Sequence, residues 1–379
     1  MRRDAIEVQR RMSSFRVRVI LWVTCALCLT ACGGSGSEPS SGPPAADPFA
    51  EVDQLAQATF RQHALTGMGV VIYDRNDRKA FEKMYGDFSP DRRVAVASAS
   101  KLISGLVLFR LVDQGFLSLD STTAEVLGWT GPQGAITLRH LLSFTSGLQP
   151  DPGCTSIPSL TLADCVAQIA TLDPVASPGI RFDYGSSHLH VAARMAEVAT
   201  GAAWNDVFSQ QLRSPLGLAS EDLRYYTSPR QVVGTTNPLI AGGLRATMDE
   251  YGRLLSVVFH RGTYQGQRLA AEDIFEQQAR EPYPDVTIGH APVTALAYGF
   301  RYGLTAWLEC ATPATGCQSI SSPGAFGWTP WVDRDGGYYA IIAMEVADPR
   351  DGFVNFSVAL AQDLKPAIRR ALASSAAGT

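Results

Sequence analysis

The sequence predicts a mixed α/β (α+β) fold, in which one antiparallel sheet is built from both chain ends and flanked by helices. Segments with strand character lie near the N-terminus and return after residue 298, whereas residues 120–290 are mostly helical with long loops. Strands at both ends with helices between them favour a single sheet that carries a helical insertion over an alternating βαβ sheet.

The first elements follow from local patterns. Residues 50–63 place apolar side chains at helical spacing, which predicts a helix. Residues 68–73 and 80–85 are interpreted as two strands, because the turn-rich tetrad at 74–77 separates them. A long apolar helix is predicted over residues 98–114.

The last elements are predicted in the same way. Residues 298–308, 325–332 and 338–346 are rich in aromatic and β-branched side chains, which are typical of strands. The Gly-rich segment 333–337 predicts a hairpin between the last two strands. A helix over residues 355–373 closes the chain, and its internal proline predicts a kink or a division into two helices.

The composition limits the classes of function. The chain has 379 residues, 46% of them hydrophobic, which is enough for a sizeable core. The net charge is −4, and no basic run follows the N-terminus, so nucleic acid is not an expected partner. The six histidines show no metal-ligand spacing, and we expect no metal ion or other cofactor.

The N-terminus has the pattern of an export signal. Arg16 and Arg18 precede an apolar run over residues 19–29, and Thr30-Ala31-Cys32 follows it. Basic residues, a short apolar run and small residues predict a signal peptide over residues 1–32. A transmembrane anchor is the alternative, but the run is short for a span. Met12 is an alternative start to Met1.

The end of this signal resembles a bacterial lipobox. In Leu29-Thr30-Ala31-Cys32 the resemblance implies lipidation of Cys32, and Gly33 after it favours the outer membrane. We therefore expect an exported protein, lipid-anchored to the periplasmic face of the cell envelope, with no other membrane contact. Residues 33–47 are rich in Gly, Ser and Pro, which predicts a flexible linker to one domain over residues 48–375.

Four cysteines remain after the signal: Cys154, Cys165, Cys310 and Cys317. An even number in an oxidising compartment indicates disulfides, although three pairings are possible and four free thiols are the alternative. We favour Cys154–Cys165 and Cys310–Cys317, because each pair is close in sequence and flanked by loop residues.

Ser98 and Lys101 form the candidate nucleophilic pair. Ser98 opens the apolar helix, and positions three apart share a helix face, so the Lys101 amine can reach the Ser98 hydroxyl. The unpaired N–H groups of a helix N-terminus stabilise negative charge there, and a buried amine can accept the serine proton. Ser100 is the rival nucleophile but has no base at this spacing. The alternative is an N-cap serine beside a surface lysine.

This S-x-x-K sequence at the start of a buried helix resembles the serine β-lactamase and penicillin-binding-protein-like family, closest to its class C β-lactamase and esterase branch. The resemblance covers roughly residues 50–375. It implies a β-lactamase/transpeptidase-like fold, with the sheet in residues 48–95 and 290–375, the helical region in residues 96–289, and an acyl-enzyme on Ser98. Further matching segments are 136–148, 178–186, 214–218 and 242–244.

The second family motif, Y-x-N, is represented by Tyr184-Gly185-Ser186, with Ser in place of Asn. The resemblance implies that Tyr184 shuttles protons beside Lys101 and that Ser186 contacts the substrate. Tyr226-Thr227-Ser228 shows the same pattern, but it lacks the preceding Pro-Gly and the following helix and is interpreted as a loop.

The third family motif is K-T-G or H-x-G on a sheet strand, and its best match is Ser322-Pro323-Gly324. The resemblance implies that Ser322 and Gly324 bind the substrate, with Gly324 letting it approach the backbone. It also implies an oxyanion hole made by the N–H groups of Ser98 and Ala325.

The two altered motifs decide the expected reaction. Ser186 and Ser322 replace residues that bind an amide side chain and a carboxylate in the family, which weakens the case for β-lactams and D-Ala-D-Ala ends. We expect a carboxylesterase first, with a β-lactamase or D-Ala-D-Ala carboxypeptidase as the alternative, and a small ester, amide or lactam as the substrate. A non-catalytic surface binding protein is the other alternative. A Ser-His-Asp esterase is disfavoured because no G-x-S-x-G is present.

Overall fold

The computed structural model describes residues 47–312, 315–346 and 353–377. The predicted signal peptide, the lipidation site at Cys32 and almost all of the predicted linker lie outside the described residues. None of the described helices combines the length and apolar character needed to cross a membrane.

One seven-stranded sheet dominates the domain, and every pair of neighbouring strands in it is antiparallel. Strands from the two chain ends meet where β1 pairs with β13. The predicted antiparallel sheet built from both termini is therefore confirmed. In spatial order the strands are β2 (Lys79–Gly86), β1 (Gly67–Asp74), β13 (Tyr338–Ala343), β12 (Thr329–Asp333), β11 (Ser319–Ser321), β10 (Trp307–Leu308) and β9 (Arg301–Tyr302).

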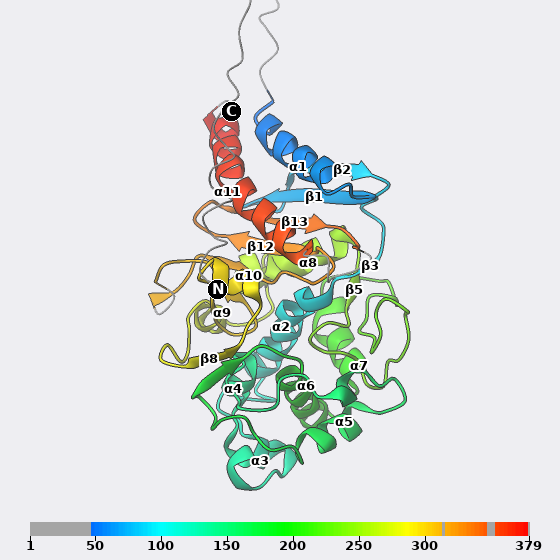
Figure 1. The fold of residues 1–379 in the computed structure, drawn as a ribbon, viewed down its shortest axis with the longest axis vertical. Coiled ribbons are helices and arrows are strands. Elements are labelled where there is room, and N and C mark those ends of the chain that lie inside the picture. The colour runs from blue at the N-terminus through cyan, green and yellow to red at the C-terminus, as the bar shows by residue number, and fades with distance from the viewer. Residues whose placement is uncertain (1–46, 313–314, 347–352, 378–379) are drawn as a thin grey trace, which may run out of the picture. The chain divides into compact units, whose positions relative to one another are not determined.

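Helices cover both faces of this sheet. α1 (Ala50–Gln62) and α11 (Phe353–Ala377) pack on one face, and α8 (Met248–Phe259) packs on the other (Figure 1). Successive residues of β1 point to opposite faces. Val70 accordingly belongs to the core under α1 and α11, and Val71 belongs to the larger core that continues into the helical region.

The helical region is built around α2 (Ser100–Asp113). Every residue from Ser100 to Leu111 is buried, as expected of a helix that is apolar on all sides and enclosed by others. The surrounding helices are α3 (Thr123–Leu127), α4 (Leu138–Leu142), α5 (Leu162–Ile169), α6 (Ser187–Thr200), α7 (Trp204–Phe208), α9 (Glu272–Gln278) and α10 (Val293–Ala297). The described residues also form small two-stranded sheets. In these, β3 (Val94–Ala95) pairs with β5 (Arg245–Ala246), β4 (Arg181–Asp183) pairs with β8 (Thr287–His290), and β6 (Thr263–Tyr264) pairs with β7 (Gln267–Arg268).

The N-terminal predictions are confirmed, whereas three C-terminal ones need correction. The predicted strand 298–308 is two short strands, β9 and β10, because Thr305 adopts a positive φ of 62° between them. The predicted strand 325–332 begins only at Thr329, since Gly327 (φ 87°) lies in a turn. Finally, α11 runs through Pro366 as one helix, so the predicted division into two helices is wrong and a kink stays a prediction. Strand β11 was not predicted.

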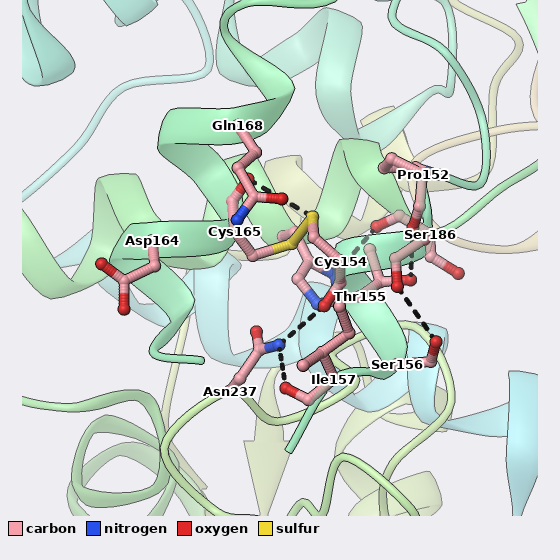
Figure 2. The surroundings of a disulfide bond; sticks show 12 residues. Pro152, Cys154, Thr155, Ser156, Ile157, Asp164, Cys165, Gln168, Ser186 and Asn237 are labelled. Atoms are coloured by element: carbon pink, nitrogen blue, oxygen red, sulfur yellow. Dashed lines mark hydrogen bonds between the residues drawn. A yellow bond between two sulfur atoms is a disulfide. The ribbon is translucent and has the colours of Figure 1, made fainter. Parts of the chain in front are cut away.

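Both favoured cysteine pairs are disulfide-bonded in the structure. The Cys154 and Cys165 sulfurs lie 2.06 Å apart and join the 3₁₀ turn Gly153–Ser156 to α5. The buried Asn237 amide donates hydrogen bonds to the carbonyls of Cys154 (2.9 Å) and Ile157 (3.0 Å), as Figure 2 shows. A distant loop thus fastens the same turn.

Candidate active site

Ser98 and Lys101 lie together at the start of α2. Ser98 sits in the 3₁₀ turn Ala97–Ala99, and Lys101 is in the first turn of the helix. The Lys101 ammonium donates to Ser98 Oγ at 3.0 Å and to the Ala241 carbonyl at 2.9 Å. Lys101 is only 4% exposed. The predicted pair therefore has the geometry for proton transfer between the hydroxyl and an amine.

The nucleophile turn is held in an unfavourable backbone conformation. Ala97 has φ 48°, which L-residues rarely adopt. Two contacts from other elements keep the turn in place: the Val96 N–H donates to the Leu244 carbonyl (3.1 Å), and the Tyr251 hydroxyl donates to the Ala99 carbonyl (2.8 Å). Such strain persists only where the surroundings impose it, and it is concentrated at functional sites.

Ser100 has a structural role instead of a nucleophilic one. It is fully buried, and its Oγ accepts the Leu244 N–H at 3.1 Å. One turn further along α2, the Ser104 hydroxyl donates to the Ile240 carbonyl at 2.9 Å. These two serines fasten residues 240–244 to the helix, which also places the Ala241 carbonyl beside Lys101.

Tyr184 lies beside Lys101, between β4 and α6. The Lys101 nitrogen is 4.5 Å from the centroid of the Tyr184 ring, whose other neighbours include Trp307 at 5.2 Å in a stacked arrangement. The contact with the ammonium is thus made by the ring face, a cation–π interaction that positions both side chains. The structure brings the predicted trio of Ser98, Lys101 and Tyr184 into one site.

His188 holds the segment that carries Tyr184. Its two ring nitrogens lie 2.7 Å from Ser146 Oγ (Nδ1) and 2.7 Å from the Asp183 carbonyl (Nε2). A carbonyl only accepts, so Nε2 carries the proton and Nδ1 accepts from Ser146. Burial lowers the pKa of His188 to about 4, so the ring is neutral at pH 7. These contacts give His188 a structural role, and its link to Tyr184 was not predicted.

Ser186 lines a pocket together with Ser98 and Lys101. The segment just before the 3₁₀ turn Gly153–Ser156 holds Ser186 in place. Its N–H donates to Asp151 Oδ1 (2.9 Å) and to the Pro150 carbonyl (2.7 Å). A Cβ at Gly185 would collide with Pro150, so only glycine permits this approach. Figure 2 shows Ser186 beside the disulfide-bonded turn.

The third motif contacts the nucleophile but differs from the prediction. Ser322 Oγ donates to the Ser98 carbonyl at 3.2 Å. Gly324 lies in the turn between β11 and β12, not on a strand, and a Cβ there would collide with the Val96 carbonyl oxygen. Gly324 therefore makes room for the backbone before Ser98, which the sequence did not indicate; its expected contact with the substrate stays a prediction. Ala325 lies in the same turn.

Ser98 and Lys101 line a pocket of about 350 Å³, within the usual size range for ligand sites. Much of its wall comes from residues 227–231, which belong to the segment that the sequence analysis interpreted as a loop and did not assign to the site. Within the described residues, no group of three His, Cys, Asp or Glu side chains could hold a metal ion. The described lining residues are Ala97, Ser98, Lys101, Ser186, Thr227, Ser228, Pro229, Arg230, Gln231, Leu239, Ala241, Gly242 and Phe326.

Comparisons with known proteins show the family and the fold of the chain. A family model described as "Beta-lactamase" matches residues 52–363. The D-alanyl-D-alanine-carboxypeptidase/endopeptidase AmpH of Escherichia coli K12 is 28% identical over 231 residues, which are 55% of this chain and 57% of AmpH. Penicillin-binding protein 4 of Amycolatopsis lactamdurans is 31% identical over 32% of this chain and 33% of its own length. The chain thus spans little more than half of the first relative and a third of the second.

Solved structures share the fold over most of the chain. A putative β-lactamase from Bacteroides dorei is 29% identical, with a TM-score of 0.75 over 84% of this chain and 98% of its own. EstCE1, a hydrolase with promiscuous acyltransferase activity, is 19% identical, with a TM-score of 0.65 over 86% of this chain and 98% of its own. At that identity the second likeness concerns the fold alone.

Proposed function

Because this chain belongs to the β-lactamase family, we propose that it is a serine hydrolase, and specifically a carboxylesterase that acts through an acyl-enzyme on Ser98. The observation that carries the proposal is the 3.0 Å hydrogen bond between Lys101 Nζ and Ser98 Oγ at the pocket wall. The family match and this intact pair favour a hydrolase over a non-catalytic binding protein.

The pair explains how the serine is activated. In its neutral form, Lys101 accepts the Ser98 proton as Oγ attacks the carbonyl carbon of the ester. The Ala241 carbonyl, 2.9 Å from Nζ, orients the amine and stabilises the ammonium that results. The leaving alcohol takes a proton from Tyr184, which regains one from the Lys101 ammonium, so both groups end acylation as they began it. Water then loses a proton to Lys101 as it attacks the acyl-enzyme, and that proton passes to Ser98 Oγ as the acid is released.

The remaining groups stabilise charge and move protons. The N–H groups of Ser98 and Ala325 would receive the oxyanion of the tetrahedral intermediate. Support for Ala325 comes from its turn, in which Ser322 hydrogen-bonds Ser98 and Phe326 lines the pocket. Tyr184 borders the ammonium of Lys101, and we assign to its hydroxyl the transfer of a proton to the leaving alcohol.

An ester is favoured over a lactam by what the second and third motifs contain. Ser186 and Ser322 have short neutral side chains, and the Ser322 hydroxyl is directed to the Ser98 carbonyl. Neither side chain reproduces the amide and the cation that those family motifs otherwise carry. A simple ester needs only the nucleophile, the base and the oxyanion hole.

The test is p-nitrophenyl butyrate hydrolysis by the purified protein and by Ser98→Ala, with Ser374→Ala on α11 as the matched control. Ester turnover that is lost in Ser98→Ala and kept in Ser374→Ala supports the proposal. A chromogenic cephalosporin turned over at a similar rate would favour a β-lactamase. No turnover of either substrate, together with no phosphonate adduct on Ser98, would favour the binding protein.

We also propose export and lipidation at Cys32, on the basis of the sequence pattern at residues 16–33. Lipidation predicts that the protein partitions into detergent with the mass of the acyl chains added. A Cys32→Ser variant should remain in the aqueous phase. Equal partitioning and equal processing of both forms would refute the anchor.

A further inference from the structure

The loop closed by the Cys154–Cys165 disulfide is connected to two separate parts of the pocket wall. We call residues 154–165 the disulfide loop. None of them is among the described residues that line the pocket, whereas Ser186 and Thr227 are. Figure 2 shows the disulfide-bonded turn with Ser186 on one side and Asn237, which leads to Thr227, on the other. Each connection consists of hydrogen bonds that can be followed residue by residue.

The first connection leads to Ser186 through the segment just before the disulfide loop. The Ser186 N–H donates to the Pro150 carbonyl (2.7 Å) and to Asp151 Oδ1 (2.9 Å), and the Ser187 N–H donates to the same carbonyl (3.0 Å). The 3₁₀ turn Gly153–Ser156 follows at once, and the disulfide fixes this turn to α5. A shift of the turn would therefore move both acceptors, and Ser186 with them.

The second connection leads to Thr227 through Asn237. The fully buried Asn237 amide donates to the Cys154 carbonyl at 2.9 Å, and the Asn237 backbone carbonyl accepts a hydrogen bond from the Thr227 hydroxyl. One residue earlier, the Thr236 carbonyl accepts the Leu162 N–H at 2.8 Å. The segment behind Thr227 is thus fastened to the disulfide loop near both of its ends.

The nucleophile is held by different contacts. Residues 240–244 supply the carbonyl beside Lys101, and the buried Ser100 and Ser104 fasten that segment to α2. The Tyr251 hydroxyl holds the turn that carries Ser98. None of these contacts involves the disulfide loop. A change in the loop should therefore displace the pocket wall and leave the reacting pair in place.

We propose that the disulfide loop positions Ser186 and Thr227 and thereby determines which acyl groups the pocket accepts. This inference rests on the proposed function of the Ser98 site. Cys154, Cys165 and Asn237 are then positioning residues, because they act on the substrate only through the wall. An acetyl group is short and needs only the nucleophile and its immediate partners. A hexanoyl group extends along the wall, so its binding depends on where the wall lies.

The test measures kcat/KM for p-nitrophenyl hexanoate relative to p-nitrophenyl acetate, at a temperature at which circular dichroism shows each variant folded. In Cys154→Ala/Cys165→Ala we expect this ratio to fall about tenfold, since a misfit of one methylene costs at least that much. The fall should come from a higher KM for hexanoate, with kcat for acetate within about twofold of the wild type. General destabilisation would not produce this difference between two esters.

Asn237→Ala keeps the disulfide and removes only the second connection. We expect a smaller fall of the ratio, and this variant decides the question by itself if the cysteine variant does not fold. In the triple variant the ratio should fall less than the product of the two separate effects, because both changes act through the same loop. Independent effects that simply multiply would overturn the inference.

The matched control is Cys310→Ala/Cys317→Ala, which removes the other disulfide, and neither of its cysteines lines the pocket. The control should keep the wild-type ratio. A wild-type ratio in the folded Cys154→Ala/Cys165→Ala and Asn237→Ala proteins would overturn the inference alone, as would an equal fall in the control. A wild-type protein that hydrolyses neither ester would overturn the proposed function as well.

Discussion

Gly105 offers a sharp test of how α2 is seated in the core. In an ordinary helix interior, Gly→Ala stabilises the protein by about 1 kcal/mol, because alanine loses less backbone entropy on folding. Here a Cβ at Gly105 would collide with Thr305 Oγ1 and lie 2.9 Å from Thr305 Cβ. Thr305 is fully buried and has a φ of 62°, so it has little freedom to move away.

The overpacking should outweigh the helix propensity. Extra methyl groups in packed cores cost about 1–3 kcal/mol, so we expect Gly105→Ala to lower the free energy of unfolding instead of raising it. Thr305→Gly removes the colliding atoms and suits the positive φ. The double variant should therefore be more stable than the sum of the single variants predicts, with a coupling of about 1–3 kcal/mol.

Urea unfolding followed by circular dichroism measures these differences through the transition midpoint. The matched control is Gly153→Ala, where the added Cβ meets nothing within 4 Å and little change is expected. A Gly105→Ala protein that is as stable as the wild type would refute the reasoning. So would additive effects in the double variant, because they would mean that the two side chains do not compete for the same space.

The remaining predictions concern stability. His188 has a pKa of about 4 in the folded protein against 6.5 for an ordinary histidine. The free energy of unfolding that the neutral ring contributes is therefore complete above about pH 6.5 and is lost as the pH falls toward 4. In His188→Gln, the loss of stability from pH 7 to pH 4, measured by urea titrations, should be smaller by up to about 3 kcal/mol; an unchanged pH dependence would contradict the assignment. Lys365 forms an ion pair with the nearly buried Glu309, so Lys365→Met should cost about 3 kcal/mol by leaving the carboxylate unpaired, and adding Glu309→Gln should recover part of this in the same titrations. No recovery would argue against an uncompensated charge as the cause. The Cys154–Cys165 disulfide closes a loop with a sequence separation of 11, and replacing both cysteines with alanine should lower the free energy of unfolding by about 2–3 kcal/mol, whereas equal thermal midpoints would exclude that contribution.

Several parts of the site could be predicted because local geometry determines them. Ser98 and Lys101 are three positions apart at the start of a helix, and that spacing alone places both on one face. The helix itself follows from an apolar sequence without proline between residues 100 and 113, in which Gly105 is the single glycine. The strands near the N-terminus could be predicted equally well from the sequence, because a turn-rich tetrad separates two runs of strand-forming residues.

Other parts depend on contacts that no local pattern contains. The approach of the Val96 carbonyl to Gly324 was not predicted, because Val96 is more than 200 residues earlier in the sequence. His188 acts through Ser146, 42 residues earlier, and nothing near either residue indicates the pairing. Arg230 lies in a loop that the sequence analysis did not assign to the site, and it lines the pocket because that loop folds against residues 241–242 and Phe326.

The sequence by itself determined the antiparallel sheet built from both chain ends, the nucleophile helix and the spacing of the Ser98–Lys101 pair. These depend on periodicity and on interactions within a few residues, which are the same wherever the segment lies. Only the tertiary structure decided which loops enclose the pocket and which charge it presents. Ser322 and Ser98, for example, are 224 residues apart and hydrogen-bonded. Such contacts are set by the packing of the whole core, which brings distant segments together at distances that no single segment encodes.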